Sequence, residues 1–175
     1  PSQDFYITID NTAPTLSDIK FKDAGTSYVN DGKGVILYFT ANETLTEFPT
    51  VTLGNKQVNV NYENVENNKY RAYLYVDKNI NEGELKFEIS YKDTAGNEGK
   101  SVSATTNGSK AIVDLTVPKI TLKDGSDKNA PVIGSNPYQA VSYKIYDNYG
   151  YSRVELNGTV IHTHTTPPIW GDINN

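Results

Sequence analysis

The sequence predicts an all-β chain of two tandem β-sandwiches, of which the second lacks its last strands. Two observations support this prediction. A D-x-T-x-P signature occurs twice, and its copies lie 104 residues apart, from Asp10 to Asp114. Between the copies, apolar residues recur at every second position, which is the period of a strand with one buried face. Because one small sandwich has about 100 residues, each copy is expected to introduce one sandwich.

The repeated signature has a local physical reason. Proline fixes its own φ and holds the preceding residue in extended geometry, while Asp and Thr side chains bond nearby backbone groups. The signature therefore predicts a short, stiff joint between sandwiches. Its residues are Asp10, Thr12 and Pro14 in the first copy and Asp114, Thr116 and Pro118 in the second.

The two joints divide the chain into three parts. Residues 1–10 alternate as a strand and run directly into the first joint, so we interpret them as the terminal strand of a preceding module or as a linker. Residues 11–117 are predicted to form one complete sandwich. Residues 118–175 are predicted to form a partial second one.

The complete sandwich is expected to contain about seven strands, ending with one at Lys110–Leu115. Turn signals separate the strands at Asp31–Gly34, Gly54–Asn55 and Glu82–Gly83. No apolar stripe of helical period persists, so an immunoglobulin-like sandwich is favoured, with a closed barrel as the alternative. The predicted inward positions are Ile19, Phe21, Val35, Leu37, Phe39, Val51, Leu53, Val58, Val60, Tyr70, Ala72, Leu74, Val76, Leu85, Phe87, Ile89 and Tyr91.

The second part is predicted to be truncated. Its strands are expected at Lys119–Lys123, Ala140–Tyr146 and Arg153–Ile161, the last with a turn at Asn157-Gly158. So few strands leave one face of the sheet open. We expect cover from Ile169 and Trp170 folding back and from edge pairing.

Composition excludes several classes of function. A net charge of −5 gives no basic field for a phosphate backbone, so nucleic acid is not an expected partner. No apolar run reaches the ~20 residues of a membrane-spanning helix, so no membrane insertion is expected. With no cysteine in the sequence, disulfides, thiolate metal sites and a cysteine nucleophile are excluded.

Three segments are similar to a known family. The first joint, the segment Tyr91–Asn97 (YKDTAGN) and the segment Tyr146–Gly150 (YDNYG), which is followed by Val154–Gly158, resemble bacterial immunoglobulin-like (Big-type) repeats of Gram-positive surface or secreted proteins. The resemblance implies an extracellular location and neighbouring immunoglobulin-like repeats as partners in the same chain. It does not specify a function, since such repeats occur in stalks, adhesins and glycan-degrading enzymes.

One segment raises the possibility of calcium binding. Asp93 and Asn97 offer oxygen ligands, and Asp10 or Asp114 could lie close to them at a joint. The alternative is a tight turn in which Gly96 supplies a positive φ and the polar side chains bond their own backbone. The oxygen ligands are few, so we favour the turn and expect no metal and no cofactor.

Exposed aromatic side chains form the candidate binding surface. Tyr38, Tyr73 and Tyr75 fall on the outward phase of their strands, where they could stack on a host glycan or dock a protein. The alternative is that tyrosine is simply favoured on sheet surfaces.

Catalysis is not expected in this chain. The sequence has no G-x-S-x-G, H-E-x-x-H or glycine-rich phosphate loop. Four carboxylates, Glu43, Glu47, Glu63 and Glu66, could pair for glycosidic chemistry, but nothing in the sequence brings them together. The sequence therefore predicts a non-catalytic spacer of a bacterial surface or secreted protein. The alternatives are an adhesin module and an accessory module of a carbohydrate-active enzyme.

Overall fold

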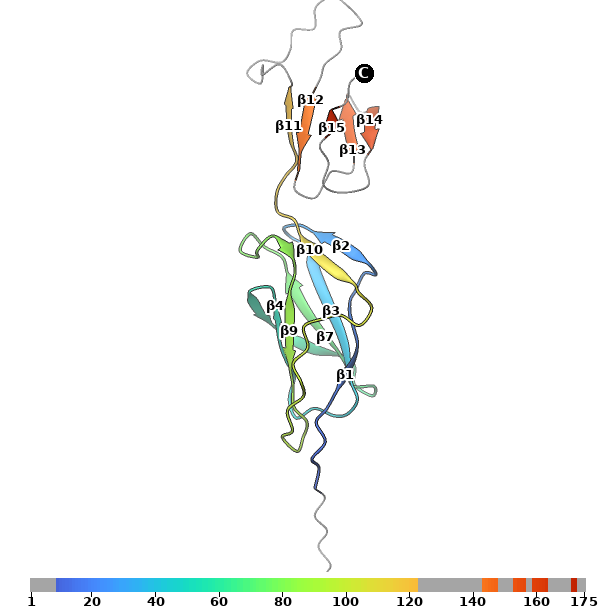
Figure 1. Ribbon diagram of the computed structural model, residues 1–175, viewed down its shortest axis with the longest axis vertical. Helices are drawn as coiled ribbons and strands as arrows, with labels where there is room; N and C mark the ends of the chain where they lie inside the picture. The colour runs from blue at the N-terminus through green and yellow to red at the C-terminus, as the bar shows by residue number, and fades with distance from the viewer. Residues whose placement is uncertain (1–8, 123–142, 148–152, 157–158, 164–170, 173–175) are drawn as a thin grey trace, which may run out of the picture. The chain divides into compact units, whose positions relative to one another are not determined.

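The computed structural model describes residues 9–122, 143–147, 153–156, 159–163 and 171–172. Every element in these residues is a strand, and the chain divides into two compact units, Pro1–Leu115 and Thr116–Asn175. In the described part, no helix has the length and apolarity needed to cross a membrane. The two units are described separately below (Figure 1).

One layer of the first unit is a four-stranded antiparallel sheet in the order β1-β3-β7-β6. Its strands have strictly alternating burial over β3 and β7, because apolar side chains occupy every second position. The bounds are β1 (Leu16–Phe21), β3 (Gly34–Ala41), β7 (Lys69–Tyr75) and β6 (Val60–Asn64).

Two three-stranded sheets complete the first unit. One has the order β5-β4-β9, with strands β5 (Lys56–Val58), β4 (Thr50–Leu53) and β9 (Phe87–Ser90). The other has the order β2-β10-β8, with β2 (Thr26–Val29), β10 (Lys110–Val113) and β8 (Gly83–Glu84). In the second of these sheets, β10 runs parallel to β2 and antiparallel to β8.

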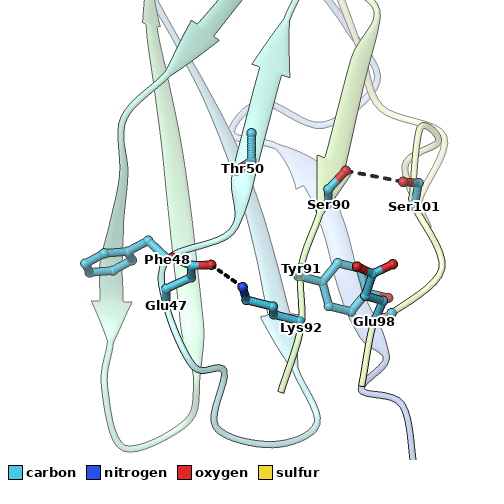
Figure 2. Close-up of a pocket in the computed structure, with 9 residues that line it drawn as sticks. Glu47, Phe48, Thr50, Ser90, Tyr91, Lys92, Glu98 and Ser101 are labelled. Carbon is cyan, nitrogen blue, oxygen red and sulfur yellow. Dashed lines mark hydrogen bonds and ion pairs between the residues drawn. The ribbon is translucent and has the colours of Figure 1, made fainter. Parts of the chain in front are cut away.

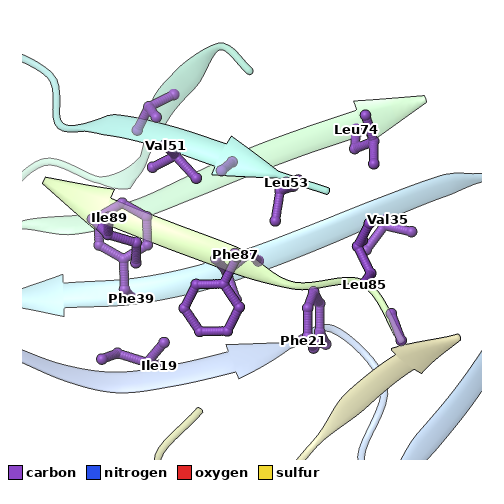
Figure 3. Close-up of a cluster of buried hydrophobic side chains, with 14 of the residues drawn as sticks. Ile19, Phe21, Val35, Phe39, Val51, Leu53, Leu74, Leu85, Phe87 and Ile89 are labelled. Carbon is purple, nitrogen blue, oxygen red and sulfur yellow. The ribbon is translucent and has the colours of Figure 1, made fainter. Parts of the chain in front are cut away.

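All three sheets of the first unit share one hydrophobic core. Figure 3 shows side chains of β4 and β9 facing those of β1, β3 and β7, which is the arrangement of a β-sandwich. Phe21 and Phe87 meet edge to face, with ring centroids 5.9 Å apart, and so join the two layers. Of the predicted inward positions, all are buried except Val58, which packs at the edge of the core.

The structure differs from the predicted strands at three places. Val58 and Val60 continue one alternation in the sequence, but Val58 pairs with Val51 in β4, whereas Val60 pairs with Ala72 in β7. The chain therefore passes from one sheet to the other at residue 59. Apolar and polar residues continue to alternate through this point, so the sequence gives no sign of the change. The alternation from Leu85 to Tyr91 likewise does not form one long strand, because β9 covers only Phe87–Ser90 and β8 ends before it, at Glu84. The short strand β2 was not predicted, because Val29 is its only buried residue.

The described residues of the second unit form five short strands. A three-stranded sheet has the order β11-β12-β15, with β11 (Lys119–Leu122), β12 (Tyr143–Tyr146) and β15 (Gly171–Asp172). A separate hairpin is formed by β13 (Arg153–Leu156) and β14 (Thr159–Thr163). The described strands lie within the predicted ranges with two exceptions: β14 continues past Ile161 to Thr163, and β15 was not predicted. The expectations for residues 1–8, Asn157-Gly158, Ile169 and Trp170 fall outside the described residues, and the immunoglobulin-like and tandem character of the units stays a prediction.

Candidate functional site

The first candidate site is the Asp93–Asn97 turn, which follows β9. Gly96 has a φ of +93°, a left-handed conformation that glycine adopts without strain. Asp93 is fully buried, and its Oδ1 accepts a hydrogen bond from the Asn97 backbone N–H at 2.8 Å. The Asp93 Oδ2 accepts a second one from the Asn97 side-chain Nδ2, also at 2.8 Å. The turn is thus closed by its own first and last residues.

Asn97 also joins this turn to the residues before β1. Its Nδ2 lies 3.1 Å from the carbonyl oxygen of Asp10 and 3.2 Å from that of Thr12. The Asp10 carboxylate accepts the Thr12 backbone N–H at 2.9 Å, which shapes this stretch of chain as an Asx turn. One amide therefore holds residues that lie more than 80 positions away in the sequence.

The same stretch is held a few residues further on. The Thr15 N–H donates to Asn42 Oδ1 at 2.7 Å, and the Asn42 N–H donates to the Thr15 carbonyl at 3.1 Å. Pro14, between the two attachments, is fully buried. We call residues 9–15 the N-terminal joint. Its described residues are bonded to two loops of the unit that they introduce.

The electrostatics of Asp93 fit a structural role. Burial raises the pKa of its carboxyl, but hydrogen bonds from the Asn97 side chain and from the N–H groups of Asn97, Gly96 and Ala95 outweigh burial, so the pKa lies below its ordinary value. The ionised carboxylate is the form that accepts these bonds. Both of its oxygens have donors, so it is not a free acid or base.

The structure places the predicted calcium ligands in two different regions. The carboxylate oxygens of Asp10, Glu43 and Asp93 lie within 4.8 Å of one another, beside Asn97. Asp114 does not join them, because it follows β10, where its N–H donates to the Val29 carbonyl. Glu43 was missed as a ligand candidate, and only its position in the loop after β3 could have suggested it.

The geometry at Asn97 favours the turn over a cation. The carbonyls of Asp10 and Thr12 and the Asp93 Oδ2 all converge on the Asn97 Nδ2, which is a donor. A cation would need the same oxygens as ligands. The neutral amide already supplies the positive partial charge that those oxygens require.

The second copy of the signature lies at the end of the first unit, and we call residues 114–118 the C-terminal joint. The Leu115 N–H donates to Glu82 Oε1 at 2.6 Å. Val117 is 80% exposed and Pro118 is exposed, in contrast to the buried Pro14. The backbone N–H groups at the start of the C-terminal joint, those of Asp114 and Leu115, are therefore bonded to the unit that precedes it.

A second candidate site is a shallow groove of about 350 Å³ beside β9, lined mainly by polar side chains. Figure 2 shows Lys92 pointing toward Glu47, with which it forms an ion pair at 2.8 Å, and Ser90 facing Ser101. The Phe48 ring points away from these residues and packs on Tyr62, with ring centroids 5.0 Å apart. Among the described residues that line the groove, we find no acid, base or nucleophile that is both buried and without a partner.

The four carboxylates considered for glycosidic chemistry are distributed over the first unit. Glu43 lies at the N-terminal joint, and Glu47 pairs with Lys92. Glu63 pairs with Arg71 at 3.4 Å, and Glu66 is exposed in the turn between β6 and β7. They form no carboxylate pair with one another.

The candidate aromatic residues share one sheet face. Tyr38 lies opposite Arg71, and the outward side chains of β7 include Tyr73 and Tyr75. Tyr73 is 48% and Tyr75 is 55% exposed, whereas Tyr38 is half-buried. The structure thus places on one face the three side chains that the alternation had placed outward.

Comparisons with known proteins give a distant structural likeness. The sequence matches no family model and no curated protein. Among solved structures, a chain described as "GspB Siglec domain" aligns with a TM-score of 0.42 and 15% sequence identity, over 63% of this chain and 61% of that chain. So distant a likeness indicates no function for this chain.

Proposed function

We propose that this chain is a non-catalytic spacer module of a large bacterial surface or secreted protein, in series with neighbouring immunoglobulin-like repeats. The observation that supports this proposal best is the attachment of the N-terminal joint. Asn97 and Asn42 bond the joint at two points, and Pro14 is buried between them. A preceding module would therefore be held at a fixed angle rather than on a flexible tether.

The layout of the first unit agrees with a role as a spacer. In Figure 1 the chain enters this unit at one end and leaves it, after β10, at the other end. A module whose two connections lie at opposite ends adds its full length to a stalk. Stiff connections of this kind keep the end-to-end distance of a stalk close to its maximum, whereas flexible Gly/Ser linkers shorten it.

The extracellular location and the Gram-positive source are part of the proposal. They rest on the resemblance to bacterial immunoglobulin-like repeats and on the absence of cysteine, since such modules rely on packing. An adhesin module and an accessory module of a carbohydrate-active enzyme remain the alternative functions.

The proposal is tested by a distance between two spin labels. The chain has no cysteine, so Ile9→Cys and Tyr28→Cys, both at exposed positions, give one label at the first residue of the joint and one on the sandwich. Double electron–electron resonance should give one narrow distance distribution. The same pair with Asn97→Ala should give a broad one, and a broad distribution in the parent chain would overturn the proposal.

A further inference from the structure

The outer face of the β1-β3-β7-β6 sheet combines aromatic and basic side chains. Its outward positions on β3 alternate with the buried residues of the core, and those on β7 do the same. Opposite pairs in the register share a face, since side-chain direction alternates along both strands together. The outward residues are Ile36, Tyr38 and Thr40 on β3 and Lys69, Arg71, Tyr73 and Tyr75 on β7.

On β7 these residues form an ordered series. Two cations, Lys69 and Arg71, are followed by two rings, Tyr73 and Tyr75, at every second position. Successive members are spaced by about 7 Å, because a strand rises ~3.4 Å per residue. This spacing suits a ligand with a charged group at one end and a flat apolar face beside it.

The aromatic part of the face is open because a glycine lies beneath it. A Cβ added to Gly34 would lie 2.5 Å from the Tyr73 Oη and 2.6 Å from its Cε2, so the ring lies over the Gly34 backbone. A larger residue at 34 would lift the ring off the sheet. Tyr73 therefore offers its free side to solvent as a platform, and 48% of the residue is exposed.

The basic part of the face is not neutralised. Lys20 of β1, Tyr38 and Arg71 form one cross-strand row, and the Lys69 Nζ lies 5.5 Å from the centre of the Tyr38 ring. Arg71 has a partner in Glu63, but Lys20 and Lys69 form no ion pair with any residue of the described part. This excess of positive charge lies on a chain whose net charge is −5.

We propose that this face binds a carboxylated oligosaccharide, with one sugar ring stacked on Tyr73 and its carboxylate held by Arg71 and Lys69. A pyranose has an apolar C–H face that an aromatic ring can cover, and a carboxylate complements the cations beside that ring. A neutral sugar would leave Lys69 without an ionic partner. A uronate polymer and a sialylated glycan both have the required chemistry.

Binding should be measured by calorimetry and by amide chemical-shift changes in the intact chain. The probes are trigalacturonate and sialyllactose, with neutral lactose as the matched control. We expect at least one carboxylated probe to bind, shifting amides of β3 and β7, with affinity falling as salt is raised. Binding of trigalacturonate would identify the ligand as a uronate polymer, and binding of sialyllactose would identify it as a sialylated glycan. Either result supports the proposal.

Three variants complete the test. Tyr73→Ala should lower the affinity at least tenfold, and so should Lys69→Gln, which removes the charge and keeps a polar side chain only one atom shorter. Tyr28→Ala, at an exposed position of β2, should leave the affinity unchanged. Equal affinity for lactose, no binding of either acidic probe, or unchanged affinity in Lys69→Gln would overturn the proposal.

Discussion

The two copies of the D-x-T-x-P signature lie in different surroundings. In the N-terminal joint, Pro14 is buried and the backbone is bonded by Asn97, a residue of the unit that follows. In the C-terminal joint, Pro118 is exposed, and the N–H groups of Asp114 and Leu115 donate to the unit that precedes. The difference indicates that the signature sets only the local backbone conformation. The Asp93–Asn97 turn is what fixes the N-terminal joint to its unit. Residues 118–175 contain no second D-x-A-G-N segment.

The largest effect is expected from removing the side chain that holds the N-terminal joint. Asn97→Ala deletes all the bonds from Nδ2 and leaves the buried Asp93 without its side-chain donor. Urea denaturation should show a loss of about 2 kcal/mol in the free energy of unfolding.

The matched control is Asn55→Ala. Asn55 makes one exposed side-chain bond, to the Asn79 carbonyl at 3.2 Å, so its loss should change the stability by less than about 0.5 kcal/mol. Equal losses in the two variants would show that the turn is no more than an ordinary surface loop.

A smaller difference is expected between the two prolines. Replacing either proline by alanine frees the unfolded chain to a similar degree. Pro14→Ala also loses buried contact, so it should destabilise by about 1 kcal/mol more than Pro118→Ala. Thermal unfolding followed by circular dichroism would compare them, and a larger effect at Pro118 would reverse our ranking of the joints.

Acid should weaken the attachment of the N-terminal joint. The pKa of Asp93 is lower in the folded chain, so its contribution to stability is complete above the unfolded value, about 3.9, and is lost as the pH falls through the folded value. Unfolding measured from pH 6 down to pH 2 should therefore show a loss of stability below about pH 4. Asp93→Asn should be less stable at pH 6 and should show a shallower decline with acid. A decline of unchanged steepness would assign the effect to other carboxylates.

The smallest effect is expected from chelation. The Asn97 amide occupies the position that a cation would need between the oxygens of Asp10, Thr12 and Asp93. EDTA should therefore leave the unfolding temperature unchanged. A fall of several degrees that calcium restores would show that Asp10, Glu43 and Asp93 hold a cation.

The sequence predicted the core better than the connections. Alternation depends only on which face of a strand is buried, so residues such as Leu37 and Ile89 could be assigned inward without knowledge of their partners. It could not show that the chain changes layers at residue 59, because the alternation continues through the change. Sheet membership depends on pairing between strands that are distant in the sequence.

The candidate site was predicted only in part. The Asp93–Asn97 segment was recognisable as a turn, since its Gly and Asx residues act locally. The role of Asn97 as a donor to Asp10 and Thr12 depends on contacts across more than 80 residues, as does the position of Glu43. The outward direction of Tyr73 followed from the alternation, but its support by Gly34 did not.

The rigidity of the N-terminal joint is tested most directly by backbone ¹⁵N relaxation. We predict order parameters of about 0.85 at Thr12 and Ala13, equal to those of the strands, and values below about 0.6 at both residues in Asn97→Ala. Val117, in the C-terminal joint, should not change in that variant. Order parameters below about 0.6 at Thr12 and Ala13 in the parent chain would contradict the account.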